Sequence, residues 1–226
     1  MSNNPLLKNH SKTILTLMIL IVSSNLECIS AGSYSLPISE RSFLLGVVPI
    51  PRNFPNFSQE DLIDAYEMAG EIAEVVPVHD PQSWIEKTEK LKKNRIIEVL
   101  RDRFNLTPII SLGIMSVQSI GGKPQIVIEV PPDMPSTTTL KDAELRRRWI
   151  EEAAKIAREL KPQYLQLGNE INFSYEVDPK TYEDYISLYK EAYDAVKKAS
   201  PNTKIFTVFS YNHLVSNSRW HLIQGL

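Results

Sequence analysis

The sequence predicts an α/β fold in which parallel strands alternate with helices. Short apolar runs recur along the chain at intervals of roughly 30 to 55 residues, and helical patterns separate them. The composition is that of a globular protein, because 42% of the 226 residues are hydrophobic and 23% are charged. The net charge of −2 gives no basic excess, so no nucleic-acid partner is expected.

The N-terminal segment, residues 1–30, is predicted to be a signal peptide. Lys8 and Lys12 precede the apolar run Ile14–Val22, which is followed by small and polar residues. Nine residues are too few to cross a hydrocarbon core as a helix, which takes about 20. An uncleaved anchor is the alternative. We therefore expect a secreted or cell-surface protein with one domain over residues 31–226 and no integral membrane span in its mature form.

Five apolar runs are expected to form the strands of a parallel sheet. They are close to continuous, as in strands that are buried on both faces. The expected strands are Phe43–Ile50, Glu74–His79, Thr107–Ile114, Gln163–Gly168 and Thr203–Phe209.

Four helical patterns lie between or after these runs. Ser58 is the expected N-cap of the first helix, and Asp61 stands three residues later, as in a capping box. The second helix is expected at about residues 83–104 and the third at residues 142–160. Thr181 is the expected cap of the fourth, whose stripe of tyrosines we interpret as packing side chains. The long excursion between the third strand and the third helix contains two adjacent glycines and is expected to form a small hairpin or loop.

Two architectures use this order of elements. A doubly wound sheet usually has a Gly-rich turn after its first strand, and the turn Pro49–Pro55 contains neither a G-x-G-x-x-G motif nor a Walker lysine. A (β/α)8 barrel instead places its functional side chains at the carboxyl ends of successive strands. Polar and aromatic residues do follow the expected strands: Arg52, Asn53, His79, Asp80, Ser116, Gln118, Asn169, Glu170, Asn172, Ser210, Tyr211, Asn212 and His213. The sequence thus predicts an incomplete (β/α)8 TIM barrel of about five strand–helix units.

Asn169 and Glu170 are the strongest candidate site residues, because they follow an apolar strand and Gly168. A carboxylate at the mouth of a buried strand is costly to desolvate, and burial would raise its pKa toward the range of a general acid. Glu170 is therefore the candidate catalytic proton donor. The amide of Asn169 offers both a donor and an acceptor, which suits binding to a hydroxyl group. The alternative is that the pair only begins a solvated loop.

The stretch Tyr164–Asn172, continued through Ser200–Ile205, resembles the clan of retaining glycoside hydrolases built on (β/α)8 barrels, in which an Asn-Glu pair ends the fourth strand. Within the clan it looks most like endo-β-1,4-galactanases and related endoglycanases. The resemblance implies that Glu170 is the acid/base and that Asn169 binds the 2-hydroxyl of the sugar being cleaved. It implies no cofactor, and its expected partner is a polysaccharide or oligosaccharide substrate.

The second carboxylate of a retaining hydrolase is missing from this pattern. Retention needs a nucleophile about 5 to 5.5 Å from the acid, and in the clan it comes from the end of the seventh strand. Glu176 and Asp178 follow Glu170 closely, and neither matches that position. Five strands cannot close an eight-stranded barrel. We therefore expect a truncated chain with little or no turnover, with a half-barrel that pairs with another chain as the alternative.

Further candidate substrate-binding residues are Arg52, His79, Trp84, Asn172 and Tyr211. Each has a plainer interpretation: Arg52 as a bridge between loop carboxylates, His79 as a partner of the backbone, and Trp84 as packing at the start of a helix. A metal site is disfavoured because no short-spaced pair of ligands such as H-E-x-x-H is present. The expected function is that of an exported glycoside hydrolase-like protein acting on a β-linked polysaccharide, with a non-catalytic carbohydrate-binding or scaffold protein as the alternative.

Overall fold

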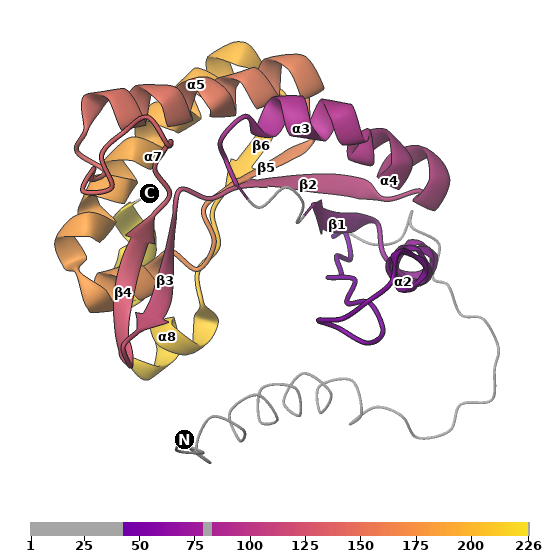
Figure 1. The fold of residues 1–226 in the computed structure, drawn as a ribbon, viewed down its shortest axis with the longest axis horizontal. Helices are drawn as coiled ribbons and strands as arrows, with labels where there is room; N and C mark the ends of the chain where they lie inside the picture. The colour runs from indigo at the N-terminus through magenta and orange to yellow at the C-terminus, as the bar shows by residue number, and fades with distance from the viewer. Residues whose placement is uncertain (1–42, 79–82, 226) are drawn as a thin grey trace. The chain divides into compact units, whose positions relative to one another are not determined.

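The computed structural model describes residues 43–78 and 83–225. The predicted signal peptide and His79 lie outside these ranges. The described part is an α/β fold with a four-stranded parallel sheet and a two-stranded antiparallel hairpin (Figure 1). None of the helices in these ranges is long and apolar enough to span a membrane.

The parallel sheet has the order β1-β2-β5-β6, so each strand lies next to the one that follows it along the chain. Its strands are β1 (Val75–Val78), β2 (Thr107–Leu112), β5 (Tyr164–Leu167) and β6 (Lys204–Phe206). The register places Val76 opposite Pro108, and Ile110 opposite Leu165. The last four of the five expected strands are therefore confirmed, each shorter than its apolar run.

The first expected strand, Phe43–Ile50, is reduced to a single parallel bridge between Gly46 and Val75. The carbonyl of Leu45 accepts hydrogen bonds from the amides of Glu74 and Val75 at 2.9 and 3.2 Å. This segment lies at the edge of the sheet and pairs with β1 alone among the described strands. Pairing on one side explains why the segment does not form a longer strand.

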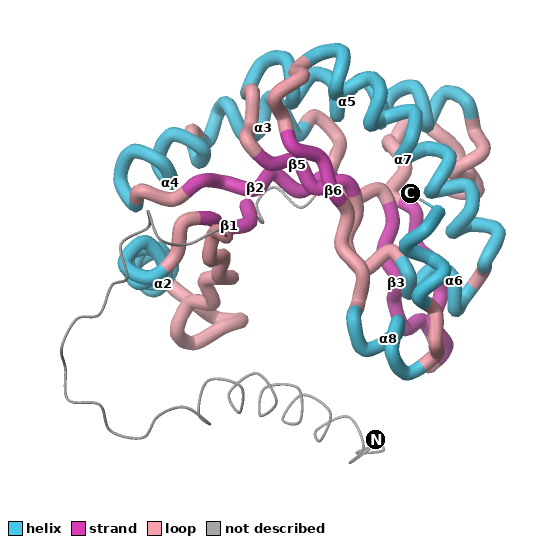
Figure 2. Tube along the Cα trace, turned by 180° about the vertical axis from the view of Figure 1, so that it is seen from behind, coloured by secondary structure: helices cyan, strands magenta, loops and turns pink. Residues whose placement is uncertain are grey.

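The remaining elements of the described chain are α2 (Gln59–Ile72), α3 (Lys87–Asn94), α4 (Ile96–Phe104), β3 (Met115–Ile120), β4 (Lys123–Ile128), α5 (Ala143–Leu160), α6 (Asn172–Val177), α7 (Pro179–Ala199), α8 (Tyr211–Ser216) and the 3-10 helix η2 (Trp220–Gly225). Helices α3, α4, α5 and α7 lie along one face of the sheet (Figures 1 and 2). The opposite face carries no described helix.

The two faces of the sheet differ in burial because side chains alternate along each strand. The residues that are completely or almost completely buried are Val76, Val78, Ile110, Leu112, Leu165 and Leu167. The alternate positions Pro77, Ile109, Ser111, Gln166 and Phe206 line an open hollow of about 640 Å³, which we call the inner hollow. The core therefore lies between the sheet and its helices, and the inner face remains accessible.

Two helices differ from their expected bounds for local reasons. The second expected helix is divided at Arg95, whose φ is +51°, and each half buries its own leucine, Leu91 in α3 and Leu100 in α4. The fourth helix begins at Pro179 instead of after Thr181, because the carboxylate of Asp178 accepts the amides of residues 180 and 181. Proline fits this first position since it has no amide hydrogen to satisfy.

Other expectations about the helices are confirmed. Ser58 and Asp61 form the predicted capping box of α2. Tyr182, Tyr185 and Tyr189 of α7 are buried, and the hydroxyl of Tyr182 donates to the carbonyl of Leu222 at 2.8 Å. Three of the four tyrosines therefore pack the helix, as interpreted from the sequence, whereas Tyr193 is 38% exposed.

The excursion after β2 contains the expected hairpin, β3 and β4. Its turn is Gly121-Gly122, with φ of +61° and +78°. Two residues with positive φ are what the mirror-image turns of tight hairpins require, so the glycines are essential to this turn. The hairpin places Ser116 and Gln118 on one face, two residues apart.

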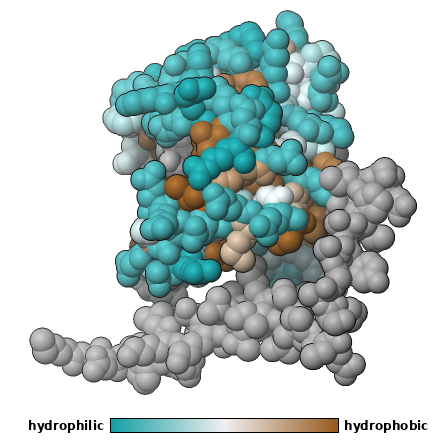
Figure 3. All heavy atoms as spheres, turned by 90° about the vertical axis from the view of Figure 1, so that its right-hand side faces the viewer, coloured by the Kyte–Doolittle hydropathy of each residue, from teal (hydrophilic) through white to brown (hydrophobic). Residues whose placement is uncertain are grey.

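Apolar side chains also reach the surface of the described domain away from the sheet. Met68 and Ile72 of α2 and Val99 of α4 are exposed. The face that turns toward the viewer in Figure 3 is mostly hydrophilic, with hydrophobic side chains gathered in its middle. Apolar atoms contribute more than half of the surface of most folded proteins, so exposed apolar side chains are not by themselves a site.

Candidate functional site

The turn from β5 into α6 positions the two strongest candidates. Gly168 has a φ of +83°, and a Cβ at this position would collide with the hydroxyl of Tyr185. That hydroxyl donates to the carbonyl of Leu167 at 2.5 Å, and the amide of Gly168 donates to the carbonyl of Leu112 at 3.2 Å. The strand end is therefore fixed by both β2 and α7, and only glycine fits at position 168.

Glu170 adopts a left-handed backbone conformation, with a φ of +46°. Such a φ is uncommon for a residue with a side chain and is often found at functional positions. Its carbonyl accepts the amide of Phe173 at 3.0 Å, which begins α6. The residue is exposed. Sequence reasoning had expected a buried carboxylate; the left-handed turn instead directs residues 169 and 170 out of the packed strand end.

Asn169 is oriented by a residue of the strand before it. Gln166, which is 8% exposed, donates from Nε2 to the Asn169 Oδ1 at 3.3 Å and to the carbonyl of Gly168 at 3.2 Å. Because its Oδ1 accepts this bond, the Nδ2 group of Asn169 is directed away from Gln166. The arrangement leaves an amide donor available at the mouth of the strand.

A hollow of about 610 Å³ lies in front of these residues, and we call it the Glu170 hollow. The hairpin forms one wall and α6 with α8 forms the other. Its lining residues are Met115, Ser116, Val117, Gln118, Ser119, Pro124, Asn169, Glu170, Phe173, Glu176, Val177 and His213. Ser116 and Asn169 also line the inner hollow, so the two hollows meet at these residues. A volume of several hundred Å³ is the size of small-molecule sites in general.

The other carboxylate of the Glu170 hollow is engaged by an arginine. The Oε1 of Glu176 accepts from Nε of Arg219 at 3.1 Å, and this hydrogen bond lowers the pKa of Glu176 below its ordinary value. Arg219 also lies over the ring of Tyr175, 5.2 Å from its centroid. Asp178 lies outside the hollow and caps α7. Glu176 is thus an ionised, ion-paired residue.

The structure separates the weaker candidates from this site. Asn172 is 1% exposed, and its amide group bonds both backbone atoms of Ser210: Nδ2 donates to the carbonyl at 3.0 Å, and Oδ1 accepts the amide at 2.8 Å. It therefore ties the end of β5 to the segment after β6 and has no free atom for a ligand. Arg52 is exposed and lowers the pKa of Asp61 slightly through its charge, after the larger effect of hydrogen bonds from Ser58. Tyr211 is 68% exposed and packs edge-on against Trp220.

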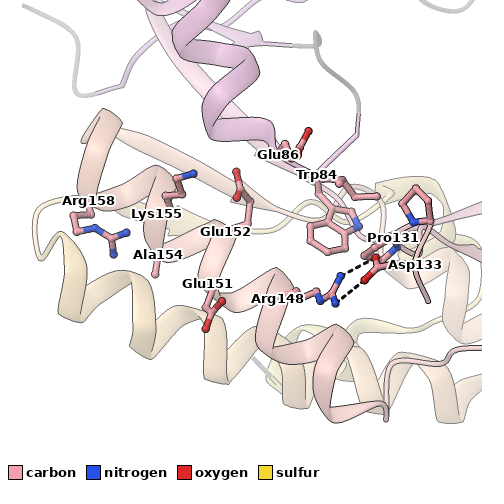
Figure 4. Close-up of a pocket in the computed structure, with 12 residues that line it drawn as sticks. Trp84, Glu86, Pro131, Asp133, Arg148, Glu151, Glu152, Ala154, Lys155 and Arg158 are labelled. Atoms are coloured by element: carbon pink, nitrogen blue, oxygen red, sulfur yellow. Dashed lines mark hydrogen bonds and ion pairs between the residues drawn. The ribbon is translucent and has the colours of Figure 1, made fainter. Parts of the chain in front are cut away.

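Trp84 does not line the Glu170 hollow, where a sugar-stacking residue was expected. It is 3% exposed, and its Nε1 donates to the carbonyl of Glu129 at 2.9 Å. It lines a third hollow of about 610 Å³ beside α5, drawn in Figure 4. The plainer interpretation, packing at the start of α3, fits this contact.

Most charged side chains of this third hollow are paired with one another or with neighbours. Arg148 holds Asp133 through two hydrogen bonds of 2.9 and 2.8 Å (Figure 4). Glu152 accepts from the amide and the hydroxyl of Thr88 at 2.6 and 2.7 Å. These contacts join α3, α5 and the loop before α5. The charged residues that make them therefore have a structural role.

Several residues in or beside the Glu170 hollow were missed as candidate binding residues. Gln166 is the one polar residue within the short strand β5 that faces the inner hollow, and a glutamine inside an apolar run was a signal available in the sequence. Phe173 and Glu176 belong to α6, a short helix that the sequence pattern did not predict. His213 was listed among the polar residues that follow the strands, without a role of its own. Among the described residues, no three His, Cys, Asp or Glu side chains gather as a metal site requires.

Comparison with known proteins adds no assignment: no protein-family model and no curated protein sequence matches this chain.

Proposed function

We propose that this chain is a glycoside hydrolase-like protein that binds a β-linked glycan in the Glu170 hollow. Glu170 is the acid/base of the site, and Asn169 binds a sugar hydroxyl beside the scissile bond. The observation that carries the proposal is the turn at the end of β5, where Asn169 and the left-handed Glu170 line one hollow with polar side chains of the hairpin. This is a concave site with a few converging polar groups.

We further propose that the sheet belongs to a barrel of the (β/α)8 type. Three features support this: the strands are parallel and in chain order, the helices lie on one face, and the other face is lined by the alternate side chains of every strand. The candidate residues lie at the carboxyl ends of the strands, where such barrels hold their sites.

In the proposed reaction the carboxyl group of Glu170 donates its proton to the glycosidic oxygen as the bond to that oxygen breaks. Its carboxylate then takes a proton from the water that completes hydrolysis. The step also requires a nucleophilic carboxylate on the opposite side of the sugar. Glu176 is the other acidic residue that lines the Glu170 hollow, and its bond to Arg219 withdraws it from that role. We therefore predict binding with little or no turnover by this chain.

The ion pair between Glu176 and Arg219 also favours the second candidate function, a carbohydrate-binding protein without hydrolytic activity. Residual turnover separates the two functions. If the chain keeps slow hydrolytic activity, it releases reducing sugar from a β-glycan at a low rate that Glu170→Gln abolishes. A pure binding protein retains glycan binding in both forms and releases no sugar with either.

Calorimetric titration with tetrasaccharides of β-1,4-linked galactose, glucose, xylose and mannose tests the proposed function. Asn169→Ala should weaken binding of the preferred tetrasaccharide about tenfold, which corresponds to about 1.4 kcal/mol for a lost hydrogen bond. Glu170→Gln should bind within about twofold of the wild type, since the amide keeps the shape of the carboxyl group. Glu183→Gln is the matched control, because this glutamate is exposed on α7 and lines none of the three hollows.

Two results would overturn the proposal. One is the absence of binding to all four tetrasaccharides. The other is an affinity for Asn169→Ala equal to that of the Glu183→Gln control.

A further inference from the structure

His213 reaches the Glu170 hollow from a separate part of the fold. It lies in α8, which follows β6, the strand next to β5 in the sheet. It lines the hollow together with Asn169 and Glu170. Its ring packs against Phe173 of α6, with the ring centroids 4.0 Å apart and the planes at 59°. The imidazole is therefore held in position by one neighbour while it borders the site.

The two nitrogens of His213 have different surroundings. Nδ1 is buried and has no hydrogen-bond partner among residues 43–78 and 83–225. Nε2 is not among the buried, unpartnered atoms, and no described residue bonds it. The residue as a whole is half-buried. The accessible edge of the ring is thus the edge that carries Nε2.

This placement favours one tautomer of the ring. A buried polar group without a partner destabilises the fold by about 1–3 kcal/mol, and a charged one by more. A proton on Nδ1 would place a buried N–H without an acceptor. The neutral ring with its proton on Nε2 avoids a buried N–H altogether and makes Nε2–H a donor at the surface of the hollow.

We infer that His213 is a ligand-binding residue, which donates a hydrogen bond from Nε2–H to a hydroxyl of the glycan in the Glu170 hollow. The inference rests on the proposed function. It adds a ligand-binding residue that the proposed function does not require. Phenylalanine would supply the same packing against Phe173 without an unpartnered nitrogen, so packing alone does not explain a histidine here. Glu176 explains little of it, because its carboxylate is bonded to Arg219 and His213 makes the smallest contribution to the lowered pKa of Glu176.

The test compares His213→Phe and His213→Gln with the wild type, using the tetrasaccharide that binds most tightly. His213→Phe keeps the ring and removes both nitrogens, so we expect binding about tenfold weaker with no loss of thermal stability. His213→Gln keeps an N–H donor, and we expect binding within about threefold of the wild type. In proton–nitrogen correlation spectra at pH 7.5, Nε2 of the wild-type ring should carry a proton, and the Nε2 resonance should shift when the tetrasaccharide is added.

The outcomes separate this inference from the proposed function. If Asn169→Ala weakens binding and His213→Phe does not, the inference is wrong and the proposed function stands. If the wild type binds none of the four tetrasaccharides, both are wrong. If His213→Phe weakens binding and also lowers thermal stability, an Nε2 resonance that the ligand leaves unchanged overturns the inference, and a shifted one supports it.

Discussion

Gly168→Ala is expected to destabilise the protein more than any other glycine-to-alanine change near the Glu170 hollow. The backbone at position 168 has a φ of +83°, where a residue with a Cβ is less stable by about 1–2 kcal/mol. The new Cβ would also collide with the Tyr185 hydroxyl and approach Cγ2 of Ile171 to 2.8 Å.

The size of the expected loss in stability follows from the hydrogen bond of Tyr185 that the collision breaks. The Tyr185 hydroxyl is fully buried and donates to the carbonyl of Leu167. Moving it away leaves buried polar atoms unpaired, which destabilises by about 1–3 kcal/mol. With the backbone contribution, the expected loss is about 3 kcal/mol. For a domain of this size that lowers the melting temperature by about 6–12 °C.

Urea unfolding of Gly168→Ala and Gly113→Ala measures the difference. Gly113 is the matched control, because it lies at the end of the neighbouring strand β2 and its new Cβ would have no atom within 4 Å. The control should change the free energy of unfolding by less than about 1 kcal/mol. In the double variant Gly168→Ala/Tyr185→Phe the loss should be smaller than the sum of the single losses, since the colliding oxygen is gone. Equal losses for Gly168→Ala and Gly113→Ala would refute the reasoning.

Two further predictions concern the same framework. Asn172→Ala removes both hydrogen bonds to the backbone of Ser210 and should lower the free energy of unfolding by about 2–3 kcal/mol in urea titrations; a loss under about 0.5 kcal/mol would show that this link is unimportant. Hydrogen bonds from Arg147 and Arg148 lower the pKa of Glu144 from 4.5 to about 2. Since the folded-state pKa is the lower one, this stabilisation is present above pH 4.5 and is lost as the pH falls toward 2. Glu144→Gln should therefore show a smaller loss of stability than the wild type over that interval, and an identical pH dependence for the two proteins would contradict the assignment.

The sequence was a good guide to elements whose signals are local. Ser58 and Asp61 predicted the start of α2 because a capping box involves only neighbouring residues. The two glycines predicted the hairpin turn for the same reason. Strands β2 and β5 were predicted from their apolar runs, although only one face of each packs against the helices and the other lines the inner hollow.

Features that depend on tertiary contacts were predicted less well. Phe43–Ile50 has the composition of a central strand, but its position at the edge of the sheet leaves only a bridge to Val75. Asn172 was expected to bind substrate, and its bonds to Ser210 depend on how the segment after β6 lies against α6. No sequence pattern contains that information.

The candidate site was predicted in part. Asn169 and Glu170 were singled out correctly as residues at a strand end that border a hollow, whereas the burial expected for Glu170 was wrong. Gln166 lies in the same strand as the turn that carries Asn169 and was a local signal, whereas His213 comes from α8 and only the fold brings it to the hollow.

Amide chemical shifts during titration with the best-binding tetrasaccharide test the central claim most directly. We predict that the largest changes occur around the Glu170 hollow, at Ser116, Asn169, Glu170 and Phe173, and that Trp84 and Arg148 of the third hollow change little. Largest changes at Trp84 and Arg148, or no changes at all, would contradict the proposal that this hollow binds a glycan.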